Sequence, residues 1–372
     1  MKLIIYRLAM KTLSANATLI TMKKNAENRV ITISKTEVPP GTHAMIDLPI
    51  SPLYTRTPIN MPIHVVNGAK PGPCLFITSA IHGDELNGVE IIRRLLKLKL
   101  INHLSGTLIA IPIVNIFGFI YRSRYLPDRR DLNRSFPGSK TGSMAARIAD
   151  LLLEEVVSKC THGIDLHTGA VHRSNWPQVR ANLNDPHTCK LANAFGTPVL
   201  INGLHLPGSL RGTAVERGIP TLLYEAGEAL RLDEFAIHVG VRGVLNVMRE
   251  LKMLKPKDKP ETSTKPVVAE ASQWIRANEA GLFLDPMPLG EKVKAGDTLC
   301  VIANPITGDE TLIQSPVSGI IIGVNHLPLV NEGEALFHVV TFKSYKSLDK
   351  VNKELKAFEY EYLQDSDLLL SL

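Results

Sequence analysis

Two histidines and a glutamate are spaced along the sequence in a way that could bind a metal ion. His82 and Glu85 stand three residues apart directly after an apolar run, so a helical turn would place imidazole and carboxylate on one face. His167 closes a second apolar run much later in the chain. Two imidazoles and a carboxylate form the ligand set of a catalytic zinc site, in which a fourth position stays open for water. The sequence therefore predicts one zinc ion per chain, held by these three residues.

Two further carboxylates could complete the chemistry. Glu225 ends a third apolar run, and a glutamate beside an activated water can take up a proton and return it to a leaving amine. The alternative is a carboxylate at a strand end that pairs with a nearby arginine. Asp165 precedes His167 by two residues and could support that ligand from behind, or serve only the fold. For His82 and Glu85 the alternative is a hydrogen-bonded pair at the start of a helix.

An arginine-rich segment lies between the predicted ligands. Residues 121–138 contain no lysine, and their arginines are Arg122, Arg124, Arg129, Arg130 and Arg134. Because a guanidinium group is planar and presents paired donors, this composition favours bidentate recognition of carboxylates. The alternative is a solvated loop, and we prefer that interpretation for Arg129.

The elements that must position these residues follow from the hydrophobic pattern. Short apolar runs typical of buried strands cover residues 74–80, 107–113, 163–167, 198–201 and 220–225, and helical spacing covers 87–99, 143–157 and 235–251. This alternation predicts an α/β domain with a mostly parallel or mixed sheet and helices on both faces. Ligands of open α/β sheets bind outside the carboxyl ends of the strands, and the predicted metal ligands and Glu225 all map there.

The composition divides the chain into five parts. We expect a basic N-terminal extension over residues 1–29, a catalytic domain over 30–251 and a charged, proline-rich linker over 252–266. Residues 267–343 consist of short β-like runs separated by Gly and Pro, which predicts a small all-β barrel or sandwich. Residues 344–372 form a tail without a chemical motif.

Charge and composition exclude several classes of protein. The formal charge of the 372 residues is +6, but the first 30 residues carry six basic residues against one glutamate, so the remainder is nearly neutral. Aromatic residues make up 5%, which argues against nucleic-acid binding. No apolar run is long enough for a membrane helix, and the four scattered cysteines form no C-x-x-C pair. We expect a cytoplasmic protein with neither nucleic acid nor membrane as partner, and leave a homo-oligomer open.

Four ordered motifs carry a resemblance to a known family. They are His82–Glu85, Asp131–Gly138, Asp165–Gly169 and Tyr224–Gly227. In this order the motifs resemble the succinylglutamate desuccinylase and aspartoacylase family of zinc-dependent hydrolases, whose fold is similar to that of the metallocarboxypeptidases. The resemblance extends over roughly residues 60 to 345 and implies the same zinc ligands, with Glu225 as general base and acid.

The resemblance also implies roles for residues around the metal. Arg124 looks like the arginine that polarises the scissile carbonyl, although Arg122 or Arg130 could take that role because the spacing to the next motif is a little longer than in some members. Asn133 and Arg134 match the pair that binds the free carboxylate of the substrate. The remaining candidates for the pocket lining are Arg211, Asn175 and Arg180. The β-rich part resembles a biotinyl or lipoyl carrier without the carrier lysine, which favours a structural module that borders the pocket.

These observations predict an amidohydrolase in which Glu225 assists the attack of zinc-activated water on a small N-acyl amino acid or related compound. Two alternatives remain open: a zinc carboxypeptidase that trims peptides, and a homologue that binds metal and ligand without turnover. Neither the acyl group nor the amine follows from the sequence.

Overall fold

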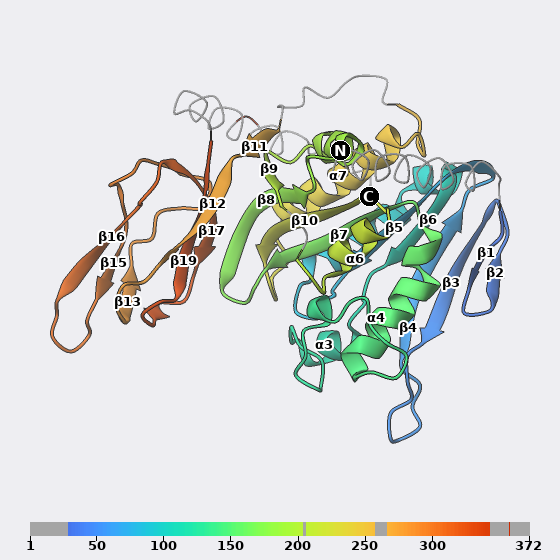
Figure 1. Ribbon diagram of the computed structural model, residues 1–372, viewed down its shortest axis with the longest axis horizontal. Coiled ribbons are helices and arrows are strands. Elements are labelled where there is room, and N and C mark those ends of the chain that lie inside the picture. The colour runs from blue at the N-terminus through green and yellow to red at the C-terminus, as the bar shows by residue number, and fades with distance from the viewer. Residues whose placement is uncertain (1–28, 204–205, 257–265, 343–356, 358–372) are drawn as a thin grey trace, which may run out of the picture.

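A large mixed sheet runs through most of the molecule (Figure 1). This computed structural model describes residues 29–203, 206–256, 266–342 and 357, so almost all of the predicted extension and tail, and most of the linker, lie outside the described residues. The strands of its N-terminal part are β1 (Ile31–Ile33), β2 (Thr36–Val38), β3 (Thr42–Pro49), β4 (Asn60–Asn67), β5 (Lys70–Ser79), β6 (Ser105–Ile111), β7 (His162–Gly169), β8 (Arg173–Ala181), β9 (Val199–Asn202) and β10 (Thr221–Glu228).

The centre of this sheet is parallel. β5 pairs in parallel with both β6 and β7, and β7 pairs in parallel with β10. β8 then runs antiparallel to β10, while β4 and β3 continue the other side in antiparallel register. Because β5, β7 and β10 run in the same direction as neighbours, their carboxyl ends meet at one edge, where the predicted ligands follow.

Helices cover both faces of the sheet, as predicted. The helices are α2 (Asn87–Lys97), α3 (Ile116–Tyr121), α4 (Met144–Glu155), α5 (Pro186–Phe195), α6 (Leu210–Glu216) and α7 (Glu234–Glu250), with short 3-10 turns η1 (Lys99–His103), η2 (Leu132–Arg134) and η3 (Val157–Lys159). Alternate residues of β5 enter two different cores. Leu75 packs with α2, α5 and α7, whereas Phe76 packs with α4 and α6. The two layers fix the sheet between them.

The C-terminal part consists of short strands, which confirms the predicted all-β module. They are β11 (Val267–Ala269), β12 (Ala271–Arg276), β13 (Gly281–Leu284), β14 (Lys292–Val293), β15 (Thr298–Ala303), β16 (Glu310–Gln314), β17 (Gly319–Asn325), β18 (Leu329–Val330) and β19 (Ala335–Thr341). β16, β15, β13 and β18 form a separate antiparallel sheet. β12, β19 and β17 instead extend the main sheet, because β17 pairs with β8.

This continuity bears on the predicted division into domains. Most of the C-terminal strands lie at one end of the molecule in Figure 1, yet these strands share hydrogen bonds with the N-terminal part at two places, β17 with β8 and β11 with β9. The boundary at residues 252–266 remains a prediction. Within the described residues, no helix is long and apolar enough to cross a membrane.

Candidate metal centre and active site

Three parallel strands bring the site residues to one edge of the sheet. His82 and Glu85 lie between β5 and α2, His167 lies near the end of β7, and Glu225 lies opposite His167 in the register of β10 against β7. We expected His82 and Glu85 on a helical turn. They lie on a tight turn instead, in which the N–H of Glu85 donates to the carbonyl of His82 at 3.2 Å, and α2 begins only at Asn87. The turn still leaves both side chains on the same side.

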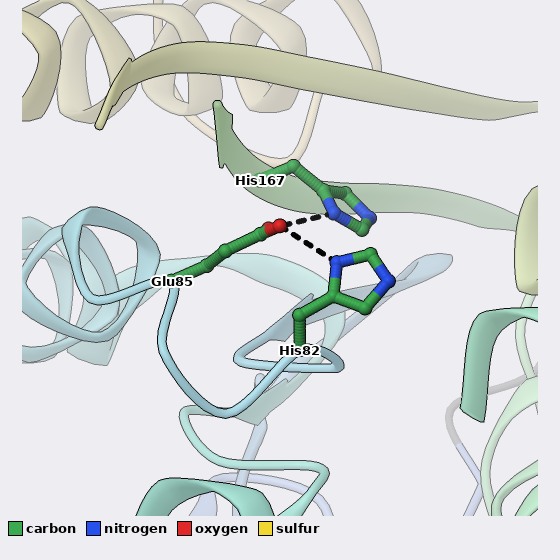
Figure 2. A group of neighbouring side chains, drawn as sticks. All are labelled: His82, Glu85 and His167. Carbon is green, nitrogen blue, oxygen red and sulfur yellow. Dashed lines mark hydrogen bonds and ion pairs between the residues drawn. The ribbon is translucent and has the colours of Figure 1, made fainter. Parts of the chain in front are cut away.

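Glu85 lies between the two imidazoles (Figure 2). Its Oε1 is 2.7 Å from Nδ1 of His82 and its Oε2 is 2.8 Å from Nδ1 of His167. All three side chains are buried, and one ligand atom from each lies within 4.8 Å of the others. Burial alone would raise the pKa of Glu85, but the facing histidines outweigh it and hold that pKa below its usual range. The cluster can therefore hold a metal ion with an anionic carboxylate as one ligand.

Carboxylates support both histidines from the opposite side of the ring. Oδ2 of Asp165 lies 2.8 Å from Nε2 of His167, and the other oxygen of Asp165 accepts a hydrogen bond from Thr78. Nε2 of His82 faces Oδ1 of Asp131 at 3.3 Å but makes no hydrogen bond of good geometry. Burial would lower the pKa of His82 and His167, yet these carboxylates and Glu85 raise both.

The orientation and the types of the donor atoms show whether these residues could hold a metal ion. A carboxylate behind a histidine orients the ring and makes the other nitrogen a stronger ligand. Here the Nδ1 atoms face inward and the Nε2 atoms face Asp165 and Asp131. The donor set of two imidazoles and one carboxylate suits zinc among the common metals. The residues fit the predicted ion.

Glu225 lines the same pocket and is held by an arginine. Nε of Arg180 donates to Oε2 of Glu225 at 2.8 Å. We expected Arg180 to line the pocket, which it does, and its ion pair with Glu225 adds a contact that fixes the carboxylate. About a fifth of the Glu225 side chain is exposed, so the carboxylate remains open to the pocket.

Arg124 lies beside the metal ligands. Its Nη2 donates to Oδ2 of Asp131 at 2.9 Å, and its Nη1 lies 3.6 Å from Oε1 of Glu85. Neither Arg122 nor Arg130, the alternatives to Arg124, lines the pocket. The guanidinium group of Arg124 is thus within reach of a carbonyl oxygen held at the cluster.

The other predicted pocket residues also line this cavity. Asn133 lies in η2, where its Oδ1 accepts from the N–H of Leu210 at 2.9 Å and leaves its amino group for a ligand. Arg134 follows it, and its Nη1 donates to the carbonyl of Asn133 at 2.7 Å. Arg211 of α6 donates to the carbonyl of Gly203 at 3.1 Å, and burial followed by the charge of Arg180 lowers its pKa. Asn175 of β8 is buried against the cavity.

The cavity has a volume of about 400 Å³. Three residues around the site were not predicted from the sequence. Asp131 belongs to the Asp131–Gly138 motif, but no feature of the sequence near it predicts that its carboxylate faces His82. Arg173 and Trp274 line the pocket from β8 and from β12 of the C-terminal module. Trp274 agrees with the expectation that this module borders the pocket. Only the pairing of distant strands brings it there.

The glycine of the Asp165–Gly169 motif has a steric role. A Cβ atom at Gly169 would come within 2.1 Å of the carbonyl oxygen of Arg173. Any larger residue would therefore push away the chain that enters β8. Gly169 allows the close return that carries Arg173 and Asn175 to the pocket.

The chain is similar in sequence to known proteins. Residues 71–251 match the family model of the succinylglutamate desuccinylase/aspartoacylase catalytic domain. The chain is 29% identical over 279 residues to N-alpha-acetyl-L-2,4-diaminobutyric acid deacetylase of Halomonas elongata, which covers 69% of this chain and 78% of the relative.

Solved structures share the fold. The product-bound ectoine utilization protein of Ruegeria pomeroyi superposes with a TM-score of 0.74 at 24% identity, over 85% of this chain and 100% of that one. A succinylglutamate desuccinylase/aspartoacylase of Rhodobacter sphaeroides gives a TM-score of 0.72 at 24% identity, over 82% and 95% of the two chains.

Fold and site together define an α/β protein with a mixed sheet and, at the carboxyl edge of its parallel strands, a buried cluster of side chains that could hold a metal ion. The chain is similar to the succinylglutamate desuccinylase/aspartoacylase family, and the match to its catalytic domain together with the deacetylase relative supports a hydrolase of amide bonds.

Proposed function

We propose that the protein is a zinc-dependent deacylase that hydrolyses the amide bond of a small N-acyl amino acid. One observation carries the proposal: the buried cluster of His82, Glu85 and His167 shares a single arginine-lined cavity with Glu225. The curated relative, a deacetylase of an N-acetylated amino acid, supports the same reaction class.

The metal site and Glu225 would have different roles in the reaction. When bound by the cluster, zinc would lower the pKa of water and polarise the amide carbonyl. Glu225 would take a proton from the attacking water and pass it to the departing amine, because its carboxylate is open to the cavity. Arg180 would keep this carboxylate in place through the 2.8 Å ion pair.

Arg124 would stabilise the negative charge that develops on the carbonyl oxygen. Its guanidinium group is fixed by Asp131 and lies beside Glu85, so little reorganisation is needed during the reaction. Asn133 and Arg134 would hold the free carboxylate of the amino acid, since an amide and a guanidinium can together satisfy both oxygens.

The size of the cavity favours a small substrate over a peptide. A volume of about 400 Å³ lies near the lower end of the range for small-molecule sites. A carboxypeptidase would need additional room for the preceding residues of its substrate.

Amine release measures the function directly. The zinc-loaded protein should hydrolyse at least one member of a panel of N-acetyl and N-succinyl amino acids, and removal of the metal with a chelator should abolish the reaction. The variant Glu225→Gln serves as a control that keeps the ligands. Preferential trimming of peptides would support the carboxypeptidase alternative, and absence of turnover with every substrate would support a binding protein.

A further inference from the structure

A buried asparagine joins the segment that carries two metal ligands to the segment that carries the proposed base. Asn87 is the first residue of α2, two residues after Glu85, and is almost fully buried. Its Nδ2 donates to the carbonyl of Ala226 at 3.2 Å, and its Oδ1 accepts from the N–H of Asp233 at 3.0 Å. Ala226 directly follows Glu225. Both bonds go to backbone groups, so they fix the path of the chain after the base.

These bonds differ from the usual role of an asparagine at the start of a helix. Such a residue commonly caps its own helix by accepting a hydrogen bond from a backbone N–H of the first turn. The N-cap residue of α2 is Leu86, which makes no side-chain cap bond. Asn87 instead bonds with both polar atoms of its side chain to the segment after β10. The needs of α2 itself therefore do not account for this amide.

The segment that Asn87 holds is irregular. β10 shifts in register against β7 between Glu225 and Glu228, and against β8 between Glu225 and Gly227. Among the described residues, Ala226 has no partner in either register. Bulges of this kind re-aim a side chain and are common beside active sites. The backbone next to Glu225 thus depends on contacts from outside the sheet.

Gly227 leaves the space that the amide of Asn87 occupies. The φ angle of Gly227 is 74°, in the left-handed region that favours glycine. A Cβ atom at this position would lie 2.4 Å from Nδ2 of Asn87. The bend of the chain at Gly227 and the amide of Asn87 therefore fit each other and form one arrangement.

A second hydrogen bond links the same two segments. The N–H of Leu230 donates to the carbonyl of Asp84 at 2.8 Å, and Asp84 directly precedes Glu85. Asn87 thus holds both ends of the segment 226–233, and Leu230 attaches its middle. Three hydrogen bonds join the chain after the base to the turn that carries the metal ligands.

Arg180 and Asn87 act on different parts of the chain at Glu225. Arg180 holds the carboxylate through the 2.8 Å ion pair, whereas Asn87 holds the backbone beside it. An arginine side chain can follow a carboxylate that shifts, so the ion pair alone does not fix the distance from Glu225 to the metal cluster. The bonds of Asn87 to the backbone fix it.

We propose that Asn87 is a positioning residue, which sets the place of the Glu225 carboxylate relative to the metal cluster by holding the backbone of the bulge. The effect on catalysis rests on the proposed deacylase function. A neutral amide takes no part in proton transfer, and Asn87 is not among the residues that line the cavity. Its influence on the reaction is therefore indirect and passes through Glu225.

Kinetics of Asn87→Ala in two backgrounds tests this route. In the otherwise wild-type enzyme the variant should lower kcat about 10- to 100-fold, because a small misplacement of a reacting group has an effect of this size. KM and the dissociation constant of zinc should change little. In the Glu225→Gln background Asn87→Ala should lower kcat no further, since residues that act as a unit are not additive. Effects that multiply would overturn the proposal.

A matched control separates positioning from a general loss of stability. Asn67 on β4 is also buried outside the cavity, where Nδ2 donates to the carbonyl of Val38 at 2.9 Å and Oδ1 accepts from the hydroxyl of Thr107 at 2.9 Å. Asn67→Ala should lower the unfolding temperature as Asn87→Ala does, but keep the wild-type kcat when assayed well below that temperature. An equal loss of kcat in both variants would overturn the proposal.

A more conservative variant covers the case in which Asn87→Ala does not fold. Asn87→Ser keeps a hydroxyl, which is too short to reach both Ala226 and Asp233. This variant should therefore have a kcat between those of the wild type and Asn87→Ala, again only while Glu225 is present. A wild-type kcat in Asn87→Ser together with a displaced segment 226–233 would contradict the proposed role.

Crystal structures of the zinc-loaded wild type and of Asn87→Ala, or of Asn87→Ser, test the position of Glu225 without turnover. In the variant the Glu225 carboxylate should be displaced relative to Glu85 or divided between two positions. An unmoved carboxylate would overturn the proposal even in an active deacylase. Displacement in a protein that hydrolyses no N-acyl amino acid would confirm the positioning by Asn87 and reject the proposed function.

Discussion

Replacing Asp165 with asparagine should weaken metal binding without disturbing the fold. Asp165 is fully buried, with Oδ1 bonded to the hydroxyl of Thr78 at 2.8 Å and Oδ2 facing Nε2 of His167 at 2.8 Å. Asparagine has the same shape, so its oxygen can accept from Nε2 and its amino group can donate to the Thr78 hydroxyl. The substitution therefore removes the charge behind the ligand and keeps both hydrogen bonds.

The expected loss follows from the role of such supporting carboxylates. Changes behind a metal-bound histidine typically reduce metal affinity about 10- to 100-fold, which corresponds to roughly 1.4–2.7 kcal/mol. Competition for zinc against a chromogenic chelator gives the dissociation constant directly. The stabilisation that zinc adds to the folded protein should shrink by about the same free energy when the metal is in excess.

A control separates this effect from a general change in charge. Asp150→Asn on α4 removes one carboxylate outside the cavity and should leave zinc affinity at the wild-type value. Wild-type affinity in Asp165→Asn would refute the reasoning, because the contact at Nε2 would then have no influence on the nitrogen that faces Glu85. A collapse of the fold in the absence of metal would show that the charge serves the structure instead.

The remaining predictions concern catalysis, recognition and pH. Glu225→Gln should retain zinc and lower kcat by roughly 100-fold or more, since proton transfer contributes on this order, whereas near-wild-type turnover would assign Glu225 to structure. Arg134→Ala should reduce the preference for a free acid over its methyl ester, and an unchanged ratio of the two specificity constants would reject the proposed binding of the substrate carboxylate by Asn133 and Arg134. Arg124→Ala should chiefly lower kcat, by about 10²–10³-fold if it acts as the oxyanion donor, and a change in KM alone would contradict this role. Burial, followed by the charge of His187, lowers the pKa of His162 to about 3 from 6.5, so the unfolded chain takes up a proton first and the free energy of unfolding should fall as pH drops from about 6.5 towards 3. His162→Gln should make the fall in the free energy of unfolding with decreasing pH less steep. The same pH dependence in the variant and the wild type would contradict the lowered pKa of His162.

The sequence predicts the parts of the site that depend on residue type and on parallel strands. His82, Glu85, His167 and Glu225 each follow or close an apolar run, and neighbouring parallel strands deliver their carboxyl ends to one edge. These residues follow or lie near the carboxyl ends of their strands, so their meeting can be predicted without knowing how the strands are paired residue by residue.

The unpredicted residues depend on register between distant segments. Strand β8 contains Pro177 and several polar residues, so its pattern does not alternate in the way that indicates a strand. Trp274 of β12 reaches the cavity through the pairing of β12 with β19, of β19 with β17 and of β17 with β8, so its position could not be predicted without β8. The helical turn expected at His82 is wrong for a local reason: the chain makes a hydrogen-bonded turn first, and the helix starts at Asn87.

The continuous sheet has a consequence for any attempt to shorten the protein. A chain ended after residue 256 would keep the metal ligands and Glu225, yet β8 would lose β17 and β9 would lose β11. Both strands would then present unpaired N–H and C=O groups beside apolar side chains such as Trp176 and Val199. Such open edges are templates for association with other chains. We therefore expect the truncated protein to aggregate, so that its catalytic part could not be produced, crystallised or transplanted without the strands that follow it.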